Sequence, residues 1–104
     1  MKTIEQTVLN VGFRNYQTEV THADNSIDIR EFSDTNAVFP AYKSLMHALE
    51  RYEGEQLHVK TDSFALATEY NATLQNPNAS LLMRLKDKIT ERNLDVTIEY
   101  VDVA

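Results

Sequence analysis

Leu57-His58-Val59-Lys60-Thr61-Asp62-Ser63 is the stretch around which the fold is organised. Its first five residues alternate apolar and polar side chains, and this alternation predicts a strand. Ser63 follows closely, and a serine hydroxyl accepts a hydrogen bond from a free backbone N–H at the start of a helix. We therefore expect a strand over 57–61 and a short helix, capped by Ser63, that continues to Tyr70.

The segment before this strand has the periodicity of a helix. Its apolar residues recur on one helical face, and they are Val38, Tyr42, Leu45, Leu49 and Tyr52. Proline is tolerated only in the first turn of a helix, so Pro40 indicates a start near Val38 or Phe39. Gly54 is the expected C-terminal cap of this helix.

Three short strands are expected in the N-terminal third of the chain. The first spans Thr7 to Phe13, and a start as early as Thr3 stays open. Two further β-rich runs, Thr18 to His22 and Ile27 to Arg30, flank the turn cluster 23–26. Two such runs around a short Asp-Asn turn predict a hairpin.

The C-terminal third predicts a helix and a closing strand. Asn76-Pro77-Asn78 breaks the chain, a helix follows from Ala79 to Arg92, and alternation predicts a strand from Val96 to Val103. The order is therefore β-β-β-α-β-α-α-β in one domain, residues 1–104. A helix between two strands normally leaves them parallel, so we expect an α+β or α/β fold with a mixed five-stranded sheet.

Three strings in this order resemble the ribonuclease H family. The stretch 57–63 resembles the family's fourth strand with the Asp-Ser pair that ends it, and residues 41–49 (Ala-Tyr-Lys-Ser-Leu-Met-His-Ala-Leu) resemble its first long helix. Residues 76–101 resemble its later helix and fifth strand. The resemblance implies a ribonuclease H-like fold without the family's final helix, since the sequence ends at Ala104 just after the fifth strand.

The resemblance also implies a chemistry, in which carboxylates hold two Mg²⁺ or Mn²⁺ ions that position a water and stabilise the leaving oxygen of an RNA phosphodiester. Asp62 matches one of these carboxylates. The first-strand Asp of the family falls at Val11, and its helix Glu falls at Ala41, or at Pro40 in a register shifted by one. Neither side chain binds a hard cation, and a lone carboxylate binds Mg²⁺ weakly.

Other acids lie near these positions in the chain, namely Glu31, Asp34 and Asp102, but none of them matches a motif position. Whether they rebuild a metal site around Asp62 stays open. Asp62 also has a structural interpretation, because an Asp at the start of a helix caps it and interacts favourably with the helix dipole.

The composition limits the classes of binding partner and of cellular location that we expect. Ten Lys and Arg against sixteen Asp and Glu give a net charge of −6, the wrong sign for a protein that binds nucleic acid by releasing counterions. No stretch approaches the roughly 20 apolar residues of a membrane span, and Lys2 is followed by no apolar signal core, so we expect a cytoplasmic protein. The absence of Cys excludes disulfides and thiolate metal sites.

The remaining polar and aromatic residues have structural interpretations. His22, His47 and His58 lack metal-type spacing; we expect His47 to be exposed and His58 to face away from its apolar neighbours. Helix 79–92 should be a solvated face with i,i+4 charge pairs, and its charged residues are Arg84, Lys86, Asp87, Lys88, Glu91 and Arg92. Most aromatic residues are expected in the core; this set is Phe13, Phe32, Phe39, Tyr42, Tyr52, Phe64, Tyr70 and Tyr100.

The sequence favours a catalytically inactive ribonuclease H-like domain that works as a binding or assembly module, as a homodimer or with a protein partner, and without a cofactor. One alternative is a Mg²⁺- or Mn²⁺-dependent ribonuclease H that acts on RNA–DNA hybrids through Asp62. Another is a non-catalytic nucleic-acid binder, and a third is an unrelated small α+β sandwich.

Overall fold

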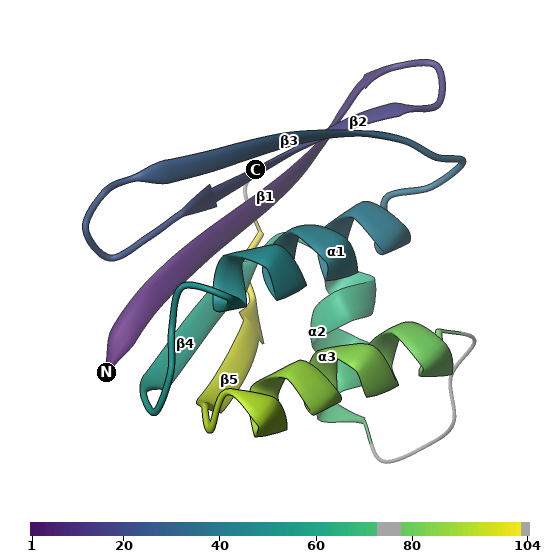
Figure 1. Cartoon of the computed structure of the whole chain (residues 1–104). Coiled ribbons are helices and arrows are strands. Elements are labelled where there is room, and N and C mark those ends of the chain that lie inside the picture. Colours follow the sequence, from purple (N-terminus) through teal and green to yellow (C-terminus); the bar gives the residue numbers. More distant parts are fainter. Residues whose placement is uncertain (73–77, 103–104) are drawn as a thin grey trace.

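The computed structural model describes residues 1–72 and 78–102, which form three strands followed by alternating helices and strands (Figure 1). The elements are β1 (Lys2–Gly12), β2 (Asn15–Thr21), β3 (Ile27–Ser33), α1 (Val38–Leu49), β4 (Gln56–Thr61), α2 (Phe64–Asn71), α3 (Ala79–Glu91) and β5 (Asp95–Tyr100). The predicted element order and the α+β class with a mixed five-stranded sheet are confirmed.

The strands form one sheet in the order β3-β2-β1-β4-β5. The three N-terminal strands are antiparallel, and β1 is parallel to β4, with Gln6 opposite Thr61. β4 is in turn parallel to β5, with Thr61 opposite Tyr100. The helical connections between β3 and β4 and between β4 and β5 explain the parallel half of the sheet, because a helical crossover returns the chain in the same direction.

All three helices lie on one side of the sheet (Figure 1). The strand residues that face them alternate with residues that face the other side, as a pleated strand requires. The two layers enclose a core whose largest fully buried apolar side chains are Tyr42, Ile4, Leu45, Leu49, Leu57, Leu66, Leu85, Val20 and Val59. No described helix is long and apolar enough to span a membrane.

The helices begin at the predicted residues, but α1 ends earlier than predicted. α1 begins at Val38, as the position of Pro40 predicts, and Ser63 Oγ caps α2 by accepting the Leu66 N–H at 3.2 Å. The prediction that Gly54 caps α1 is wrong. The helix ends at Leu49, and Gly54 instead makes a later turn with φ of +66° and donates its N–H to Arg92.

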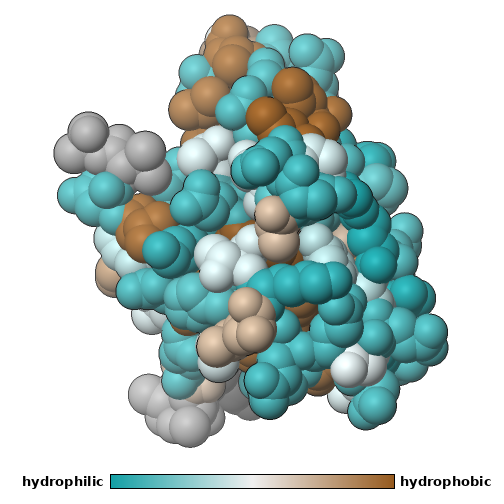
Figure 2. Space-filling model, turned by 90° about the vertical axis from the view of Figure 1, so that its left-hand side faces the viewer, coloured by the Kyte–Doolittle hydropathy of each residue, from teal (hydrophilic) through white to brown (hydrophobic). Residues whose placement is uncertain are grey.

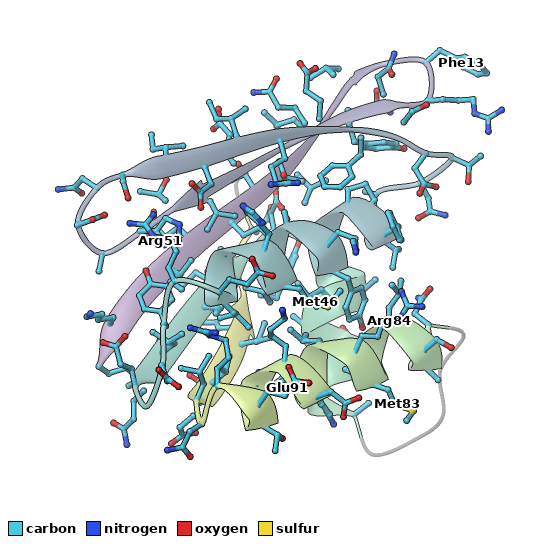
Figure 3. The ribbon with its side chains drawn as sticks, in the orientation of Figure 1. Phe13, Met46, Arg51, Met83, Arg84 and Glu91 are labelled. Carbon is cyan, nitrogen blue, oxygen red and sulfur yellow. The ribbon has the colours of Figure 1, made fainter. Side chains whose placement is uncertain are left out.

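The strands begin and end at residues that differ from the predicted ones. β1 begins at Lys2 and stops at Gly12, so Phe13 lies in the turn, 89% exposed, at the tip of the hairpin in Figure 3. β2 and β3 are longer than predicted because they pair along their whole length. β5 ends at Tyr100. The expected strand end at Val103 and the expected break at Asn76 and Pro77 lie outside the described residues.

The expectation that most aromatic residues belong to the core is wrong. Within that set, which the structure describes completely, Tyr42 and Tyr52 are buried. Phe32 and Tyr70 are half-buried, and the exposed members are Phe13, Phe39, Phe64 and Tyr100. Two of the exposed rings pair with each other, since Phe64 and Tyr100 meet edge to face with their centroids 5.4 Å apart. An aromatic residue on an apolar periodicity is buried only if another element covers it.

Candidate functional site

Asp62 lies where β4 ends and α2 begins, at the carboxyl end of the central parallel strands. Its Oδ1 accepts the backbone N–H of Val8 at 2.9 Å, and its own N–H donates to the Gln6 carbonyl. Burial raises the pKa of the Asp62 carboxyl, and the hydrogen bond from Val8 opposes this shift. The expected helix cap is therefore wrong for this residue: Ser63 caps α2, and Asp62 ties β4 to β1.

A neutral hydrogen-bond network adjoins Asp62 beneath α1. Gln6 is 1% exposed, and its Nε2 donates to the carbonyl of Ala41 at 2.7 Å and to Ser44 Oγ at 2.8 Å. Its Oε1 accepts the Thr61 hydroxyl at 2.6 Å, and Thr61 Oγ1 accepts the Ser63 N–H at 3.0 Å. Buried polar groups are stable when they are paired in this way. Sequence reasoning missed this network, because no pattern marked Gln6 as buried.

The two positions that the resemblance aligned with catalytic carboxylates lie in different surroundings. Ala41 is fully buried in α1, and the β1 residue that contacts its carbonyl is Gln6. Val11 lies near the end of β1 and is 55% exposed, in the irregular stretch where β1 turns into β2. Gln6 and Val8, rather than Val11, are the β1 residues that Asp62 contacts.

The other acids do not complete a metal centre. Asp102 shares a pocket of about 300 Å³ with Glu5 and Lys60 at the end of β4, whereas Glu31 belongs to β3 and Asp34 follows it. No three His, Asp or Glu side chains in the described ranges, 1–72 and 78–102, come close enough together to hold a metal ion. The network that adjoins Asp62 offers one amide and two hydroxyls, from Gln6, Ser44 and Thr61, and these groups bond to one another. This set does not fit two Mg²⁺ or Mn²⁺ ions, which need several carboxylates.

The three histidines have structural contacts. His22 is 2% exposed, with Nδ1 2.6 Å from the Tyr52 hydroxyl and Nε2 2.7 Å from Asp28 Oδ2. This buried chain of hydrogen bonds fixes the β2–β3 hairpin to the segment after α1, and no sequence signal identified it. His47 is exposed, as predicted. His58 faces away from the core, as predicted, and contacts Glu99 on β5 at 2.8 Å.

The basic residues of α3 and its C-cap residue Arg92 mostly contact other elements. Lys88 Nζ lies 3.0 Å from Glu50, Arg92 donates to the Tyr52 carbonyl, and Lys86 lies over the Tyr70 ring. The expected i,i+4 charge pairing within the helix is therefore replaced by contacts with the rest of the fold. Arg84 is exposed on this helix. Together with the exposed Lys86, it makes two exposed cations on this helix, a small footprint for binding phosphates.

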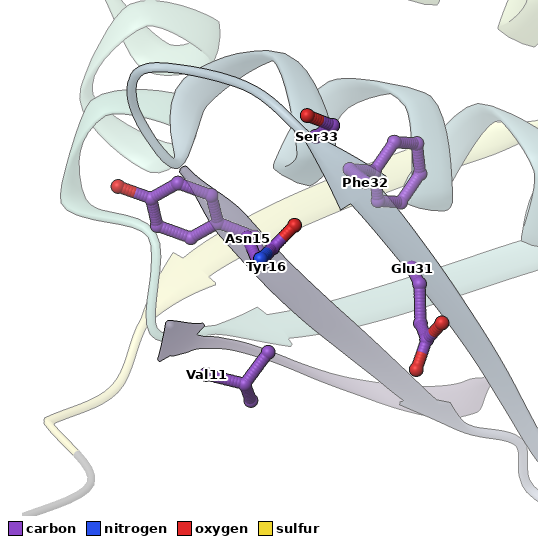
Figure 4. A pocket seen from close by; sticks show the side chains of 6 residues that line it. All are labelled: Val11, Asn15, Tyr16, Glu31, Phe32 and Ser33. Atoms are coloured by element: carbon purple, nitrogen blue, oxygen red, sulfur yellow. The ribbon is translucent and has the colours of Figure 1, made fainter. Parts of the chain in front are cut away.

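A second pocket lies at the C-terminal end of β1, with a volume of about 460 Å³ (Figure 4). The side chains of Tyr16 and Phe32 line it together with Glu31, and the remaining lining residues are Val11, Asn15 and Ser33. None of these six side chains is a cation that would recognise a phosphate. The pocket adjoins β3, the outermost strand of the antiparallel half.

The face of the sheet opposite the helices is uncovered in the described part of the chain. Leu9, Val11, Ile27 and Ile29 lie on this face, and each is between 47% and 58% exposed. Figure 2 shows a largely hydrophilic surface on which hydrophobic residues gather at the top, level with the β1–β2 hairpin of Figure 1. Exposed apolar side chains on an open sheet are typical of an interaction surface.

The two edges of the sheet differ. On the outer side of β5, Tyr70 Oη donates to the Val96 carbonyl at 2.7 Å, and Asn71 Nδ2 donates to the Ile98 carbonyl at 3.0 Å. No described side chain or backbone group bonds to the main chain of β3 on its outer side. β3 is therefore the edge on which a further strand can pair.

The chain matches no protein-family model, and no curated protein is significantly similar to it.

Proposed function

We propose that this protein is a catalytically inactive ribonuclease H-like domain that works as an assembly module. The observation that carries the proposal is the uncovered sheet face with its free edge strand. Its exposed apolar residues, Leu9, Val11, Ile27 and Ile29, belong to the same antiparallel half as that edge. A face of this kind gains stability by binding another protein surface.

The ribonuclease H-like fold is supported by the position of the last strand. The resemblance requires this strand beside a central parallel pair, and β5 lies parallel to β4, next to the β1–β4 pair. An unrelated α+β sandwich has no such requirement. The short helix after Asp62, capped by Ser63, agrees with the Asp-Ser string on which the resemblance rests.

The absence of catalysis is supported by the chemistry around Asp62. Gln6 is neutral, and its amide is fully engaged with α1 and Thr61. The Asp62 carboxylate accepts the Val8 N–H, which occupies one of its two oxygens. A two-metal mechanism needs several charged ligands to offset the repulsion between two cations.

Two measurements on the whole chain test this proposal. A labelled RNA–DNA hybrid incubated with Mg²⁺ or Mn²⁺ should remain intact, with Asp62→Asn as the matched variant. Cleavage that Asp62→Asn abolishes would establish the nuclease and overturn the proposal. Sedimentation equilibrium should show association at protein concentrations of about 100 μM, with a mass above the 11.9 kDa of one chain.

A further inference from the structure

The backbone of β3 has an alternating pattern of bonded and free groups. Its ladder with β2 begins with Asp34 N–H donating to Arg14, and it ends with His22 N–H donating to Ser26. The pairing between these two points is continuous. Hydrogen-bonded pairs alternate along an antiparallel ladder, so the even-numbered residues of β3 bond to β2. The N–H and C=O groups of Ile27, Ile29 and Glu31 therefore point outward.

The side chains of β3 decide which strand complements these free groups. A second copy of β3 can pair with the first in antiparallel orientation about a two-fold axis, with the same face of both sheets on the same side. In a register centred on Ile29, Asp28 lies opposite Arg30 of the second copy, and the reverse pair forms by symmetry. Ile29 lies opposite its own equivalent, and Ile27 lies opposite Glu31.

The neighbouring registers are unfavourable. A register centred on Asp28 places two Asp28 carboxylates opposite each other, one centred on Arg30 opposes two guanidinium groups, and one centred on Glu31 opposes two glutamates. Like charges directly opposite each other destabilise a strand pair, and opposite charges stabilise it. Of these alternatives, the register centred on Ile29 is the one whose charges are complementary.

We propose that the partner of this domain is a second copy of the same chain, joined through β3 in the register centred on Ile29. This inference rests on the proposed assembly function and names its surface and partner. The two five-stranded sheets become one continuous sheet. Ile27 and Ile29, which are 55% and 58% exposed in one chain, form a shared apolar cluster with their equivalents on the uncovered face.

The Arg30 side chain is available for an ion pair with a second chain. It is exposed and forms no ion pair within the described residues. Asp28 is held in place by His22 at 2.7 Å and by Arg51 at 4.0 Å, and its side chain is 32% exposed. A fixed carboxylate and an available guanidinium on the same strand give the self-complementary charge pattern that an isologous dimer needs.

Cysteine substitution tests the register, because the native chain contains no cysteine. Ile29→Cys should form an intermolecular disulfide on mild oxidation, since hydrogen-bonded partners have Cα atoms about 5.5 Å apart. Ile27→Cys alone should not form one, because the two copies of this residue lie about 13 Å apart along the strands. An equimolar mixture of Ile27→Cys and Glu31→Cys should form a mixed disulfide.

The oxidised products are compared on a non-reducing gel. A disulfide of Ile27→Cys as abundant as that of Ile29→Cys overturns the register, whether the copies stack face to face or collide at random. A mixed disulfide between Ile27→Cys and Glu31→Cys supports it, because this pair meets only when Ile29 lies on the two-fold axis.

Charge reversal tests the surface by sedimentation equilibrium. The native chain should have twice the mass of one 11.9 kDa copy, and Arg30→Glu should weaken the dimer about tenfold or more by placing Glu opposite Asp28. Arg84→Glu makes the same charge change on α3 and should leave association unchanged. Circular dichroism should show that both variants keep the native fold.

The outcomes separate this inference from the proposed function. A dimer that Arg30→Glu and Arg84→Glu affect equally overturns the β3 surface but leaves an assembly module in place. A native chain that remains a monomer at about 100 μM overturns both this inference and the self-association expected under the proposed function. Metal-dependent hybrid cleavage overturns the proposed function whatever the oligomeric state.

Discussion

The two edges of the sheet differ in the hydrogen bonds that they receive from the neighbouring helices. α2 runs beside β5, and Tyr70 and Asn71 donate hydrogen bonds to its outward carbonyls, Val96 and Ile98. Within the sheet, α1 packs mainly against β2 and β1, so the outer side of β3 remains free. An edge strand with free backbone groups pairs readily with another strand unless it is blocked. The protein blocks one edge and leaves the other available.

The contacts inside the sheet keep the open edge in place. His22 lies at the end of β2 and bonds to Asp28 on β3 and to Tyr52 beyond α1. Arg51 adds a contact to Ser26 in the hairpin turn, and it lies between this turn and α1 in Figure 3. The β3 edge is thus free on its outer side and anchored on its inner side, as a preorganised binding strand requires.

The largest effect is expected from His22→Ala. This change removes both hydrogen bonds of a buried imidazole and leaves the Tyr52 hydroxyl unpaired, which should lower the free energy of unfolding by about 3 kcal/mol. Urea denaturation at pH 7 measures it. His47→Ala, at an exposed position, should change stability by less than about 0.5 kcal/mol. Equal losses in the two variants would show that His22 does not anchor the open edge.

Opening the blocked edge should have the next largest effect. The double variant Tyr70→Phe/Asn71→Ala removes the donors to Val96 and Ile98 and should lower the free energy of unfolding by about 2 kcal/mol. It should also increase self-association, because β5 then has free carbonyls on its outer side. Thr68→Ala, on the exposed side of the same helix, is the control. Unchanged association would contradict the blocking role of α2.

A buried hydroxyl beside the open edge provides a stabilising prediction. Thr18 is fully buried on β2 opposite Arg30, and its Oγ1 has no hydrogen-bond partner within the described residues. Thr18→Val should raise the free energy of unfolding by about 1 kcal/mol, because it removes an unpaired buried polar atom at nearly constant volume. Thermal unfolding monitors this change. The Thr97 hydroxyl contacts His58, so Thr97→Val should give no increase in the free energy of unfolding.

The smallest effect is expected at the centre of the sheet. Asp62→Asn retains an oxygen that accepts the Val8 N–H, so stability at pH 7 should change by less than about 0.5 kcal/mol. Because burial raises the pKa of Asp62 in the folded state, ionisation of this carboxyl weakens the fold as pH rises from its ordinary pKa to the raised value. Asp62→Asn should lack this decline, which unfolding curves between pH 3 and 7 would detect.

The candidate site was less predictable than the fold. Asp62 and Ser63 were both identified from the stretch 57–63, where either residue could cap the next helix. In the structure Ser63 caps α2, and Asp62 accepts a hydrogen bond from Val8 on β1. Burial of Gln6 and His22 had no signature, since either residue is ordinary on a solvent-exposed strand. Their burial follows from the position of α1 and of Tyr52, which no local pattern specifies.

Local sequence patterns predicted the helices and strands and most of the residues at which they start. Pro40 placed the beginning of α1, Ser63 placed that of α2, and the helical connections required parallel strands in a mixed sheet. These features depend on backbone geometry and on neighbours a few residues away, so a single sequence contains them.

Which surfaces are covered depends on contacts between elements that are distant in the sequence. Phe13 and Phe64 follow apolar patterns yet are exposed, and the charges of α3 contact Glu50 and Tyr52 instead of one another. The blocked β5 edge and the open β3 edge are also tertiary outcomes. Periodicity shows which side of its own element a residue occupies, whereas burial depends on what a distant segment places against that side.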